Sequence, residues 1–438
     1  MSFDAPFRVP RSPRFASRSM SRFFPGLDFG TTNSTLALCA PGGAPRLLPV
    51  EGEHLTIPSA LFFSLEDGHT YFGRRAVFEY VDGAEGRFMR ALKSILGSAL
   101  MKETTQVGRE RMTFEDLIGR FLKHLRQKLE TETGGETDSI VLGRPVRFVD
   151  ESDEADANAQ GQLEAAARAQ GFRHIEFQFE PVAAALYFES TINAEQLALV
   201  VDIGGGTSDF SLLRLSPERA RNPDRADDIL GTTGVHVGGT DFDRLLNIAK
   251  MQPLLGLGSS TADGKRLMPV WYFNDMATWH RINTLYTPKI LADIRALRKE
   301  AAEPEKLGRM EHMLAHRSGH RLAGAVERAK IALSDEAATA IQLKEPGLAL
   351  ETAVTRGEFE AATGELVEKI DRAISEALHL GGVEAEAVDT VILTGGGAQV
   401  PAVQGAAVAR FPGARIAHSD AFGSVGLGLG LDAARRFG

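Results

Sequence analysis

The stretch that decides the fold is Val200–Leu215, VVDIGGGTSDFSLLRL. An apolar strand ends at Asp202, three glycines follow at 204–206, and a second apolar strand begins after Asp209. Because glycine has no Cβ, the backbone amides of such a turn can come close to an anion such as phosphate. The flanking carboxylates would repel a bare phosphate, so we expect a divalent cation such as Mg²⁺ between the acids and the phosphate.

A second stretch, Gly26–Leu38, GLDFGTTNSTLAL, has the same layout of acid, glycine turn, threonine and apolar strand. The two stretches lie about one domain apart, which indicates a duplicated unit. We therefore predict two similar α/β lobes whose glycine hairpins grip a triphosphate from both sides, with Asp28 as the matching acid of the first lobe. For either hairpin alone, an ordinary turn that merely needs glycine remains an alternative.

Length and composition narrow the class of protein. A chain of 438 residues is too long for one ordinary core, and 43% hydrophobic and 24% charged residues are typical of a soluble globular protein. The net charge of −9 argues against nucleic acid or an anionic membrane surface as the main partner. Cys39 is the single cysteine, which suits a reducing cytoplasm, and no apolar run is long enough to span a membrane.

Six segments carry a resemblance to a known family. The two hairpins resemble the phosphate motifs of the actin-like ATPases, and they are most similar to the nucleotide-binding domain of the Hsp70 (DnaK) chaperones. Further similar segments follow in the family's order: FEPVAAAL (179–186), VGGTDFDRLL (237–246), VERAKIALS (326–334) and ILTGGGAQVPAV (392–403). The segment GRPVRF (143–148), followed by FQFEPVAAAL (177–186), resembles sequences of the short YegD-like branch of the family. The resemblance covers Pro25 to the last residue and is weakest over Met251–Gly319.

The resemblance implies an α/β, actin-like ATPase fold, a ribonuclease H-like duplicated fold of two lobes around a central nucleotide cleft. It implies lobe I at 25–195, lobe II at 196–415 with an enlarged insertion at about 252–318, and a segment at 416–438 that returns to lobe I. Residues 1–24 are rich in Arg, Ser and Pro and are expected to be a disordered extension, with a true start at Met20 as the alternative. The chain stops just after its final helix, so we expect no peptide-binding domain. The aromatic-rich insertion is expected to be core of an enlarged lobe II, with a groove for a partner as the alternative.

The resemblance also implies ATP and ADP as ligands and roles for individual residues. Lys93 would reach the γ-phosphate and Glu180 would orient the attacking water, with Asp202 and Thr207 completing the catalytic set. Asp28, Asp202 and Asp209 would hold water-bound Mg²⁺ and any associated K⁺. The nucleotide-binding residues implied are Gly30, Thr31, Thr32, Asn33, Gly204, Gly205, Gly206, Thr207, Gly238, Gly239, Glu327, Lys330, Ser334, Gly395, Gly396, Gly397, Gln399 and Asp420.

Structural alternatives exist for several of these residues. Lys93 could be a solvated surface charge, and Glu180 could be a carboxylate favoured by a helix N-terminus. Glu327 and Lys330, three apart on a helix, could form a plain surface ion pair. Asp209 could cap its turn through a local hydrogen bond.

The chain departs from the family at the adenine pocket. Gln399 stands where an arginine is usual and Ile331 where another basic residue is usual, so stacking on the adenine is expected to be weaker. Asn33 replaces an aromatic residue beside the threonines, which alters the local ion site.

Three function classes follow. The first is a slow, cytoplasmic ATPase that converts ATP and water to ADP and phosphate and acts through a protein partner or client. The second is a nucleotide-sensing binding module without significant turnover. The third is a sugar or metabolite kinase, which needs a general-base carboxylate over a polyol pocket that the sequence does not reveal.

Overall fold

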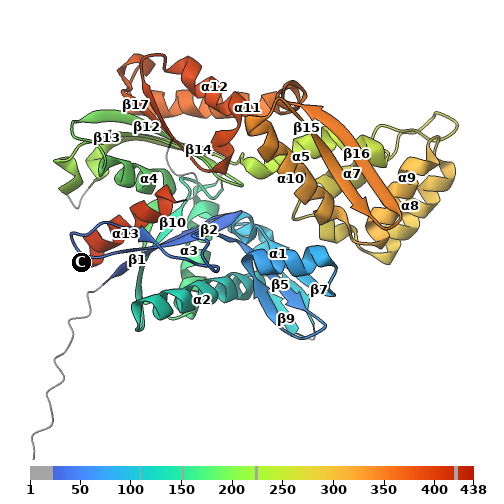
Figure 1. Cartoon of the computed structure of the whole chain (residues 1–438), viewed down its shortest axis with the longest axis horizontal. Coiled ribbons are helices and arrows are strands. Elements are labelled where there is room, and N and C mark those ends of the chain that lie inside the picture. Colours follow the sequence, from blue (N-terminus) through green and yellow to red (C-terminus); the bar gives the residue numbers. More distant parts are fainter. Residues whose placement is uncertain (1–22, 109, 150–151, 222–224, 419–422) are drawn as a thin grey trace, which may run out of the picture.

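The computed structural model describes residues 23–108, 110–149, 152–221, 225–418 and 423–438. The predicted extension at 1–24 falls outside this range except for Phe23 and Phe24, and the first strand already begins at Phe24. Two lobes lie one above the other in Figure 1, each built on its own β-sheet.

The two large sheets have the same topology. The first runs in the order β11-β10-β1-β2-β3, with β4 also pairing β2, and the second runs β14-β13-β12-β17-β18. In each, three consecutive strands are antiparallel and two later strands add in parallel. The strands are β1 (Phe24–Phe29), β2 (Asn33–Cys39), β3 (Arg46–Leu47), β4 (Ile57–Pro58), β10 (Ser139–Arg144), β11 (His174–Phe179), β12 (Gln196–Ile203), β13 (Ser208–Leu215), β14 (Ile229–Val235), β17 (Thr390–Thr394) and β18 (Arg415–His418).

The helices repeat with the strands. One helix precedes each parallel strand and one follows the last, which is the pattern of a duplicated α/β unit. The six helices are α2 (Phe114–Thr133), α3 (Asp153–Ala169) and α4 (Glu180–Glu189) in the first unit, and α11 (Arg356–Gly381), α12 (Pro401–Arg410) and α13 (Ser424–Phe437) in the second. Strand β18 extends the second sheet to His418, a little beyond the boundary predicted at 415.

Helix α2 shows why these residues form helices. Thr113 and Asp116 form a capping box at its start, and Gly134 ends it in the left-handed conformation. Its apolar face is buried in the core of the first lobe, as the helical spacing of its leucines predicts.

Helices α4 and α13 join the two lobes. Almost every residue of α4 is buried, and α13 packs against α4 and against β1, β2 and β10. A Cβ at Gly428 of α13 would lie 1.7 Å from the carbonyl oxygen of Ala183 in α4, so only glycine allows this approach. The C-terminal helix therefore lies on the first lobe, and a shared core of α4, α13 and both sheets connects the lobes.

Each lobe carries a second, smaller subdomain beside the cleft. In lobe I it comprises β5 (Ala60–Ser64), β6 (Thr70–Phe72), α1 (Gly73–Asp82), β7 (Gly86–Arg90), β8 (Thr104–Val107) and β9 (Glu110–Thr113), with the short helices η1 (Leu92–Ile95) and η2 (Ala99–Lys102). In lobe II it comprises α5 (Gly239–Lys250), α6 (Gln252–Leu255), α7 (Val270–Ala277), η5 (Ile282–Leu285), α8 (Pro288–Glu300), α9 (Pro304–Ala315), α10 (Gly319–Asp335), β15 (Ala338–Glu345) and β16 (Leu348–Thr355).

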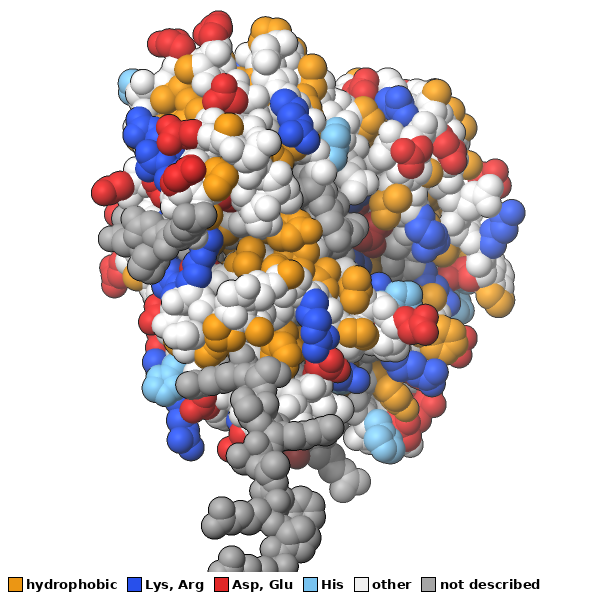
Figure 2. Space-filling view, turned by 60° about the vertical axis from the view of Figure 1, so that its left-hand side comes forward, with side chains coloured by type: hydrophobic (Ala, Val, Ile, Leu, Met, Phe, Trp, Pro, Cys, Tyr) orange, Lys and Arg blue, Asp and Glu red, His pale blue; other side chains and the backbone are white. Residues whose placement is uncertain are grey.

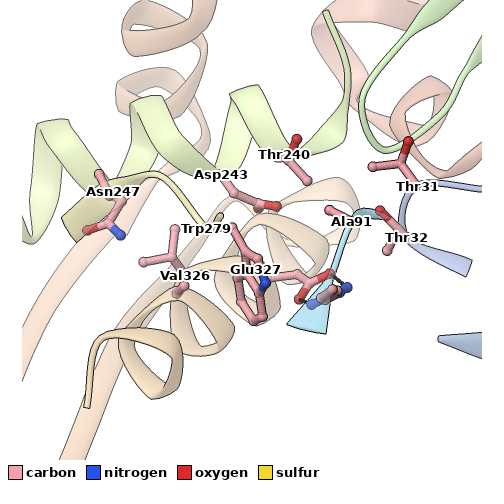
Figure 3. A pocket seen from close by; sticks show the side chains of 12 residues that line it. Thr31, Thr32, Ala91, Thr240, Asp243, Asn247, Trp279, Val326 and Glu327 are labelled. Carbon is pink, nitrogen blue, oxygen red and sulfur yellow. Dashed lines mark hydrogen bonds and ion pairs between the residues drawn. The ribbon is translucent and has the colours of Figure 1, made fainter. Parts of the chain in front are cut away.

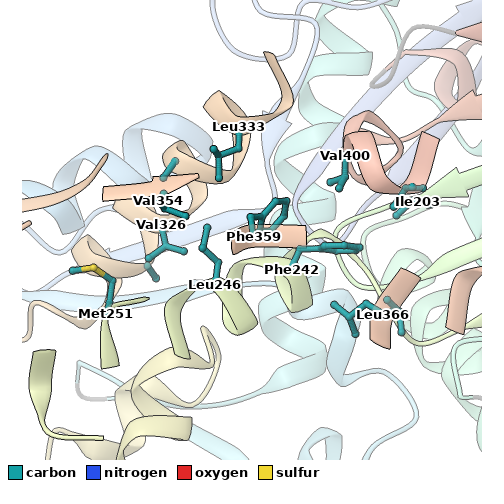
Figure 4. Packing of buried hydrophobic residues seen from close by; sticks show 14 of the residues in the cluster. Ile203, Phe242, Leu246, Met251, Val326, Leu333, Val354, Phe359, Leu366 and Val400 are labelled. Atoms are coloured by element: carbon teal, nitrogen blue, oxygen red, sulfur yellow. The ribbon is translucent and has the colours of Figure 1, made fainter. Parts of the chain in front are cut away.

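The core of lobe II runs without a break from the large sheet into this subdomain. Phe242 of α5 and Phe359 of α11 meet with their ring centroids 6.2 Å apart, and Ile203 of β12 belongs to the same cluster (Figure 4). The aromatic-rich insertion is divided: Tyr272 and Phe273 are buried in this core, whereas Trp271 is exposed and Trp279 lies at the junction of the lobes.

The surface carries both signs of charge. On the face shown in Figure 2, acidic and basic side chains are intermixed and hydrophobic side chains gather near the middle. No helix among the described residues is long and apolar enough to cross a membrane.

Candidate functional site

The two glycine hairpins face each other across the cleft. The first turn, at 30–32, joins β1 to β2, and the second, at 204–207, joins β12 to β13. A Cβ placed on Gly205 would lie 2.0 Å from Oγ1 of Thr32, and one on Gly206 would lie 3.2 Å from Oγ1 of Thr31. The turns of the two lobes are therefore in direct contact, and a side chain at Gly205 would force them apart.

The start of helix α5 fixes the second turn. The backbone amides of Gly239 and Thr240 donate hydrogen bonds to the carbonyl oxygens of Gly204 and Gly205, at 2.9 and 2.8 Å. Gly238 packs so closely on this turn that a Cβ there would lie 2.5 Å from the nitrogen of Gly206. The segment at 237–246 thus fixes the position of the glycine turn.

A small cavity of about 80 Å³ lies between the two turns and receives residues from both lobes. Thirteen of the residues predicted from the sequence line it: Asp28, Gly30, Thr31, Thr32, Asn33, Lys93, Glu180, Asp202, Gly204, Gly205, Thr207, Gly395 and Gly396. Thr35 and Val425 line it as well and were not predicted. The cavity thus brings together most of the predicted phosphate-binding and catalytic residues.

Lys93 and Glu180 form a buried ion pair at this cavity. Lys93 is only 5% exposed, so it is not a solvated surface charge. Burial lowers the pKa of Lys93, but the carboxylates of Glu180 and Asp28 outweigh this, and the pKa is raised above its ordinary value. The lysine is therefore held as a cation inside the cleft.

Three aspartates add negative charge beside this pair. Burial and the Glu180 carboxylate raise the pKa of Asp28 and of Asp209 to about 7, and the same causes raise the pKa of Asp202 well above its usual range. Asp209 accepts a hydrogen bond of 2.6 Å from the backbone amide of Val146, on the other lobe, so it does more than cap its own turn.

Four carboxyl groups thus surround one ammonium group, and a cation would relieve the excess negative charge. No group of three or more His, Cys, Asp or Glu in the described part of the chain is arranged to hold a metal ion directly. The donor set fits a magnesium ion that keeps most of its waters and contacts the aspartates through them.

Glu327 and Lys330, both predicted to bind nucleotide, are held by partners other than each other. Both guanidinium nitrogens of Arg90, from lobe I, bind Glu327 at 3.2 and 3.3 Å. Lys330 donates to the carbonyl oxygen of Gly239 at 3.1 Å and to Asp243 at 3.0 Å. Burial raises the pKa of Asp243 to about 6, against the opposing effect of Lys330. Glu327 therefore links the two lobes.

Figure 3 shows the narrow space around this link. Thr31 and Thr32 face it from lobe I, and Asp243, Trp279 and Glu327 face it from lobe II. The guanidinium group of Arg90 lies 4.6 Å from the centre of the Trp279 ring, a cation–π contact between the lobes. This space, of about 30 Å³, is continuous with the glycine turns through the two threonines.

The remaining predicted residues lie apart from these cavities. Ile331 is 59% exposed and Gln399 is exposed, so neither is packed against the protein at the adenine position. The side chain of Ser334 is partly exposed, and Gly397 is buried so closely that a Cβ would lie 2.3 Å from Ile203. Asp420 lies outside the described residues.

Sequence reasoning missed a group of residues that join the lobes. The hydroxyl of Tyr80 in α1 lies 2.8 Å from Nδ1 of His320, whose Nε2 lies 3.0 Å from the carbonyl oxygen of Trp279. Because a carbonyl only accepts, Nε2 carries the proton and Nδ1 accepts from the tyrosine. Arg90 and Asp243 were missed as well. Asp243 stood in the quoted DFD element, but no pattern marks Tyr80, Arg90 or His320.

Comparison with known proteins gives the family. A family model described as Hsp70 protein matches residues 99–251 and 295–419, more than half of the chain. The chain therefore belongs to the Hsp70 family, and the predicted two-lobed, actin-like ATPase fold is confirmed. The gap in the match falls in the predicted insertion, and the first hairpin lies outside the matched residues.

Curated relatives extend the likeness to most of the chain. It is 29% identical over 393 residues to the chaperone protein DnaK of Thermotoga neapolitana, covering 87% of this chain and 54% of that protein. It is 29% identical over 387 residues to DnaK of Thermosipho africanus, covering 86% and 53%, and 28% identical over 410 residues to DnaK of Thermus thermophilus, covering 86% and 55%. The chain thus spans about half the length of the curated relatives it matches.

Proposed function

We propose that this chain binds ATP with Mg²⁺ in the cleft between its lobes, hydrolyses it slowly to ADP and phosphate, and acts through a protein partner that reads the position of the lobes. The proposal includes membership of the short YegD-like branch and a cytoplasmic location, for which the single, buried thiol of Cys39 is the supporting feature. It rests above all on the contact between Gly205 and Thr32, which brings both glycine turns to one acidic cavity.

The residues around the cavity take distinct roles in this proposal. Backbone groups of the turns at 30–32 and 204–207 hold the phosphates, and the buried Lys93 neutralises charge on the γ-phosphate. Glu180, at the start of α4, leaves Lys93 when nucleotide enters and orients the attacking water. Asp28, Asp202 and Asp209 hold the hydrated magnesium ion, whose charge supports phosphoryl transfer.

The nucleoside would lie farther out, between α10 and the loop at 395–399. Gly239 and Lys330 are already joined there, and Glu327 is within reach of the same helix face. Because Ile331 and Gln399 leave this position open, the pocket relies on backbone and ribose contacts more than on stacking over the base.

A single-turnover experiment tests the proposal. Protein in excess over Mg-ATP is expected to release phosphate slowly, and Lys93→Ala is expected to release it about a hundredfold more slowly, the usual loss when one charge-stabilising group is removed. Lys102→Ala is the matched control, because Lys102 is an exposed lysine of the same lobe. Equal rates for wild type and Lys93→Ala would contradict the assigned role.

A nucleotide-sensing module without turnover is the second candidate, and the ion pair between Lys93 and Glu180 favours it, since each group neutralises the other. Thermal stabilisation by Mg-ATP without phosphate release would support that candidate. The kinase alternative is weaker. A pocket of about 390 Å³ beside Gly206 contains Asp241 and Asp275, but Asp241 caps α5 and Asp275 pairs with Arg281, so neither carboxylate is free to act as a base.

A further inference from the structure

A second, larger cavity lies between the lobes, away from the glycine turns. Its volume is about 500 Å³, which is within the usual range for pockets that bind small molecules. Lobe I contributes β7 and the residues that follow it to position 105, and lobe II contributes residues 279–284 and His320. In Figure 1, β7 and α1 lie directly below α10 and α7, so the cavity spans the junction of the small subdomains. No residue predicted to bind nucleotide lines it.

One side of this cavity is apolar. Its lobe I wall consists of six hydrophobic side chains: Phe88, Met89, Leu92, Ile95, Leu100 and Phe114. Opposite them stand the ring of Trp279 and the polar side chains of Asn283 and Thr284. Such a surface favours a ligand with an apolar, flat body that can lie against the wall and the indole ring.

The same cavity is lined by an arginine that has one unsatisfied buried nitrogen. Arg90 is bound by Glu327 and Arg281 by Asp275, at 2.8 Å for the latter pair. Arg87 differs: its Nε is buried and has no hydrogen-bond partner among the described residues, and none of their carboxylates forms an ion pair with it. Burial lowers the pKa of Arg87, as it does for a cation that no carboxylate compensates. Glu103, the acidic residue in the lining, is exposed at the edge.

A cation that no carboxylate compensates is costly to bury, and an anion in the cavity would compensate the charge of the Arg87 guanidinium. We propose that this cavity is a binding site for a small amphipathic anion, with its acidic group beside the Arg87 guanidinium and an apolar, aromatic body against the hydrophobic wall of lobe I. The ligand class is an aryl or similarly apolar carboxylate.

Such a ligand would touch both lobes at once. Because its walls come from β7 on one lobe and from the segment at 279–284 on the other, binding would favour the closed arrangement of the lobes. Trp279 also lines the narrow space beside Glu327, so the two cavities share a wall. Nucleotide and anion are therefore expected to strengthen each other's binding. This coupling rests on the proposed nucleotide function, whereas the binding site itself does not.

The test uses 2-naphthoate as the probe and the full chain in isothermal titration calorimetry. Wild type is expected to bind one equivalent saturably, and the neutral analogue 2-naphthylmethanol at least about tenfold more weakly, since a hydrogen bond to a charged group is lost. Arg87→Gln is expected to weaken 2-naphthoate binding by about tenfold or more. Arg111→Gln, at an exposed arginine of β9 in the same lobe, is the control and is expected to bind like wild type.

A second variant separates loss of the site from loss of the fold. Leu100→Trp fills the cavity from its partly exposed edge without touching an arginine, and is expected to block 2-naphthoate while leaving the unfolding midpoint near that of wild type. Absence of saturable binding to wild type, unchanged binding in Arg87→Gln, or displacement of 2-naphthoate by Mg-ADP would each overturn the proposed site. If 2-naphthoate binds but leaves the affinity for Mg-ADP unchanged, the coupling is wrong. Failure of Mg-ADP to bind at all would count against the nucleotide function instead.

Discussion

A methyl group at Gly205 is predicted to wedge the two lobes apart. In Gly205→Ala the new carbon would lie 2.0 Å from Oγ1, 3.0 Å from Cβ and 3.4 Å from the nitrogen of Thr32. Rotation of the threonine side chain could move Oγ1 away, but the Cβ of Thr32 would stay at 3.0 Å, which is closer than an ordinary contact. The turns themselves must therefore separate.

The size of the effect on lobe closure depends on where the molecule can relieve the strain. Overpacking by one methyl group typically costs about 1–3 kcal/mol. Because the clash lies between lobes, opening the cleft relieves it without disturbing either lobe's core. The closed arrangement is thus expected to lose about 5- to 150-fold in its equilibrium with open forms, which corresponds to that range of free energy.

Tryptophan fluorescence measures this change directly. Trp279 contacts Arg90 across the cleft, so its emission reports lobe closure, and Trp271→Phe removes the signal of the other, exposed tryptophan. In this background Gly205→Ala is expected to red-shift the emission and to increase quenching by acrylamide. Its affinity for Mg-ATP is expected to fall by a similar factor, since closed lobes are needed to hold the phosphates from both sides.

Gly204→Ala is the matched control. It adds the same methyl group to the same turn, but its carbon would lie 3.5 Å from the carbonyl oxygen of Thr207 and contact nothing in the opposite lobe. Neither glycine has a positive φ, so backbone strain does not distinguish the two variants. If Gly204→Ala opens the ligand-free protein as much as Gly205→Ala does, or if Gly205→Ala leaves the emission of Trp279 unchanged, the hairpins are not in the contact described.

Two further predictions concern the residues that join the lobes. A double-mutant cycle of Arg90→Gln and Glu327→Gln, followed by chemical denaturation, is expected to give a coupling of about 1–2 kcal/mol, because the pair is bidentate and partly buried; additive effects would contradict the link. His320 is expected to make stability depend on pH. Burial, with a smaller effect of Arg90 and Arg87, lowers its pKa to about 3 from the ordinary value of 6.5. The unfolded chain therefore binds more protons than the folded chain between these values. The contribution of neutral His320 to the free energy of unfolding is fully present above pH 6.5. It decreases on acidification by about 1.4 kcal/mol per pH unit. His320→Gln, which keeps a donor toward the carbonyl oxygen of Trp279, is expected to lose this component between pH 4.5 and 6.5, and an identical slope in wild type and variant would contradict it.

Sequence reasoning succeeded where a residue type has few structural uses. Asp28 and Asp202 end apolar strands beside glycine turns, a position with little structural reason for a carboxylate, and both line the same cavity. The duplicated layout of the two hairpins likewise predicted the matching sheets, because identical strand–turn–strand patterns fold into the same local topology.

It failed where the partner comes from a distant part of the chain. Glu327 and Lys330 suggested a local ion pair because they are one helical turn apart, yet each is bound by a residue more than 80 positions away in sequence. Trp279 stood in a segment without clear periodicity, so its place between the lobes could not be read from spacing. Gln399 is exposed, so its packing in the folded chain gives no support for its predicted role.

Under the proposed function, the position of Glu327 would let the cleft respond to bound nucleotide. Its carboxylate is bound by Arg90 from the opposite lobe, and Glu327 is also one of the residues predicted to bind nucleotide. A nucleotide that leaves the link between Glu327 and Arg90 in place would add its own contacts between the lobes and favour their closed arrangement, whereas loss of the link would favour open forms. The state of the lobes thus depends on whether the carboxylate keeps this link. Since Arg90 and Trp279 also border the 500 Å³ cavity, an anion on Arg87 would hold the indole in place and favour the linked form. Arg90 and Trp279, which line both cavities, would therefore couple nucleotide binding, lobe closure and the second cavity.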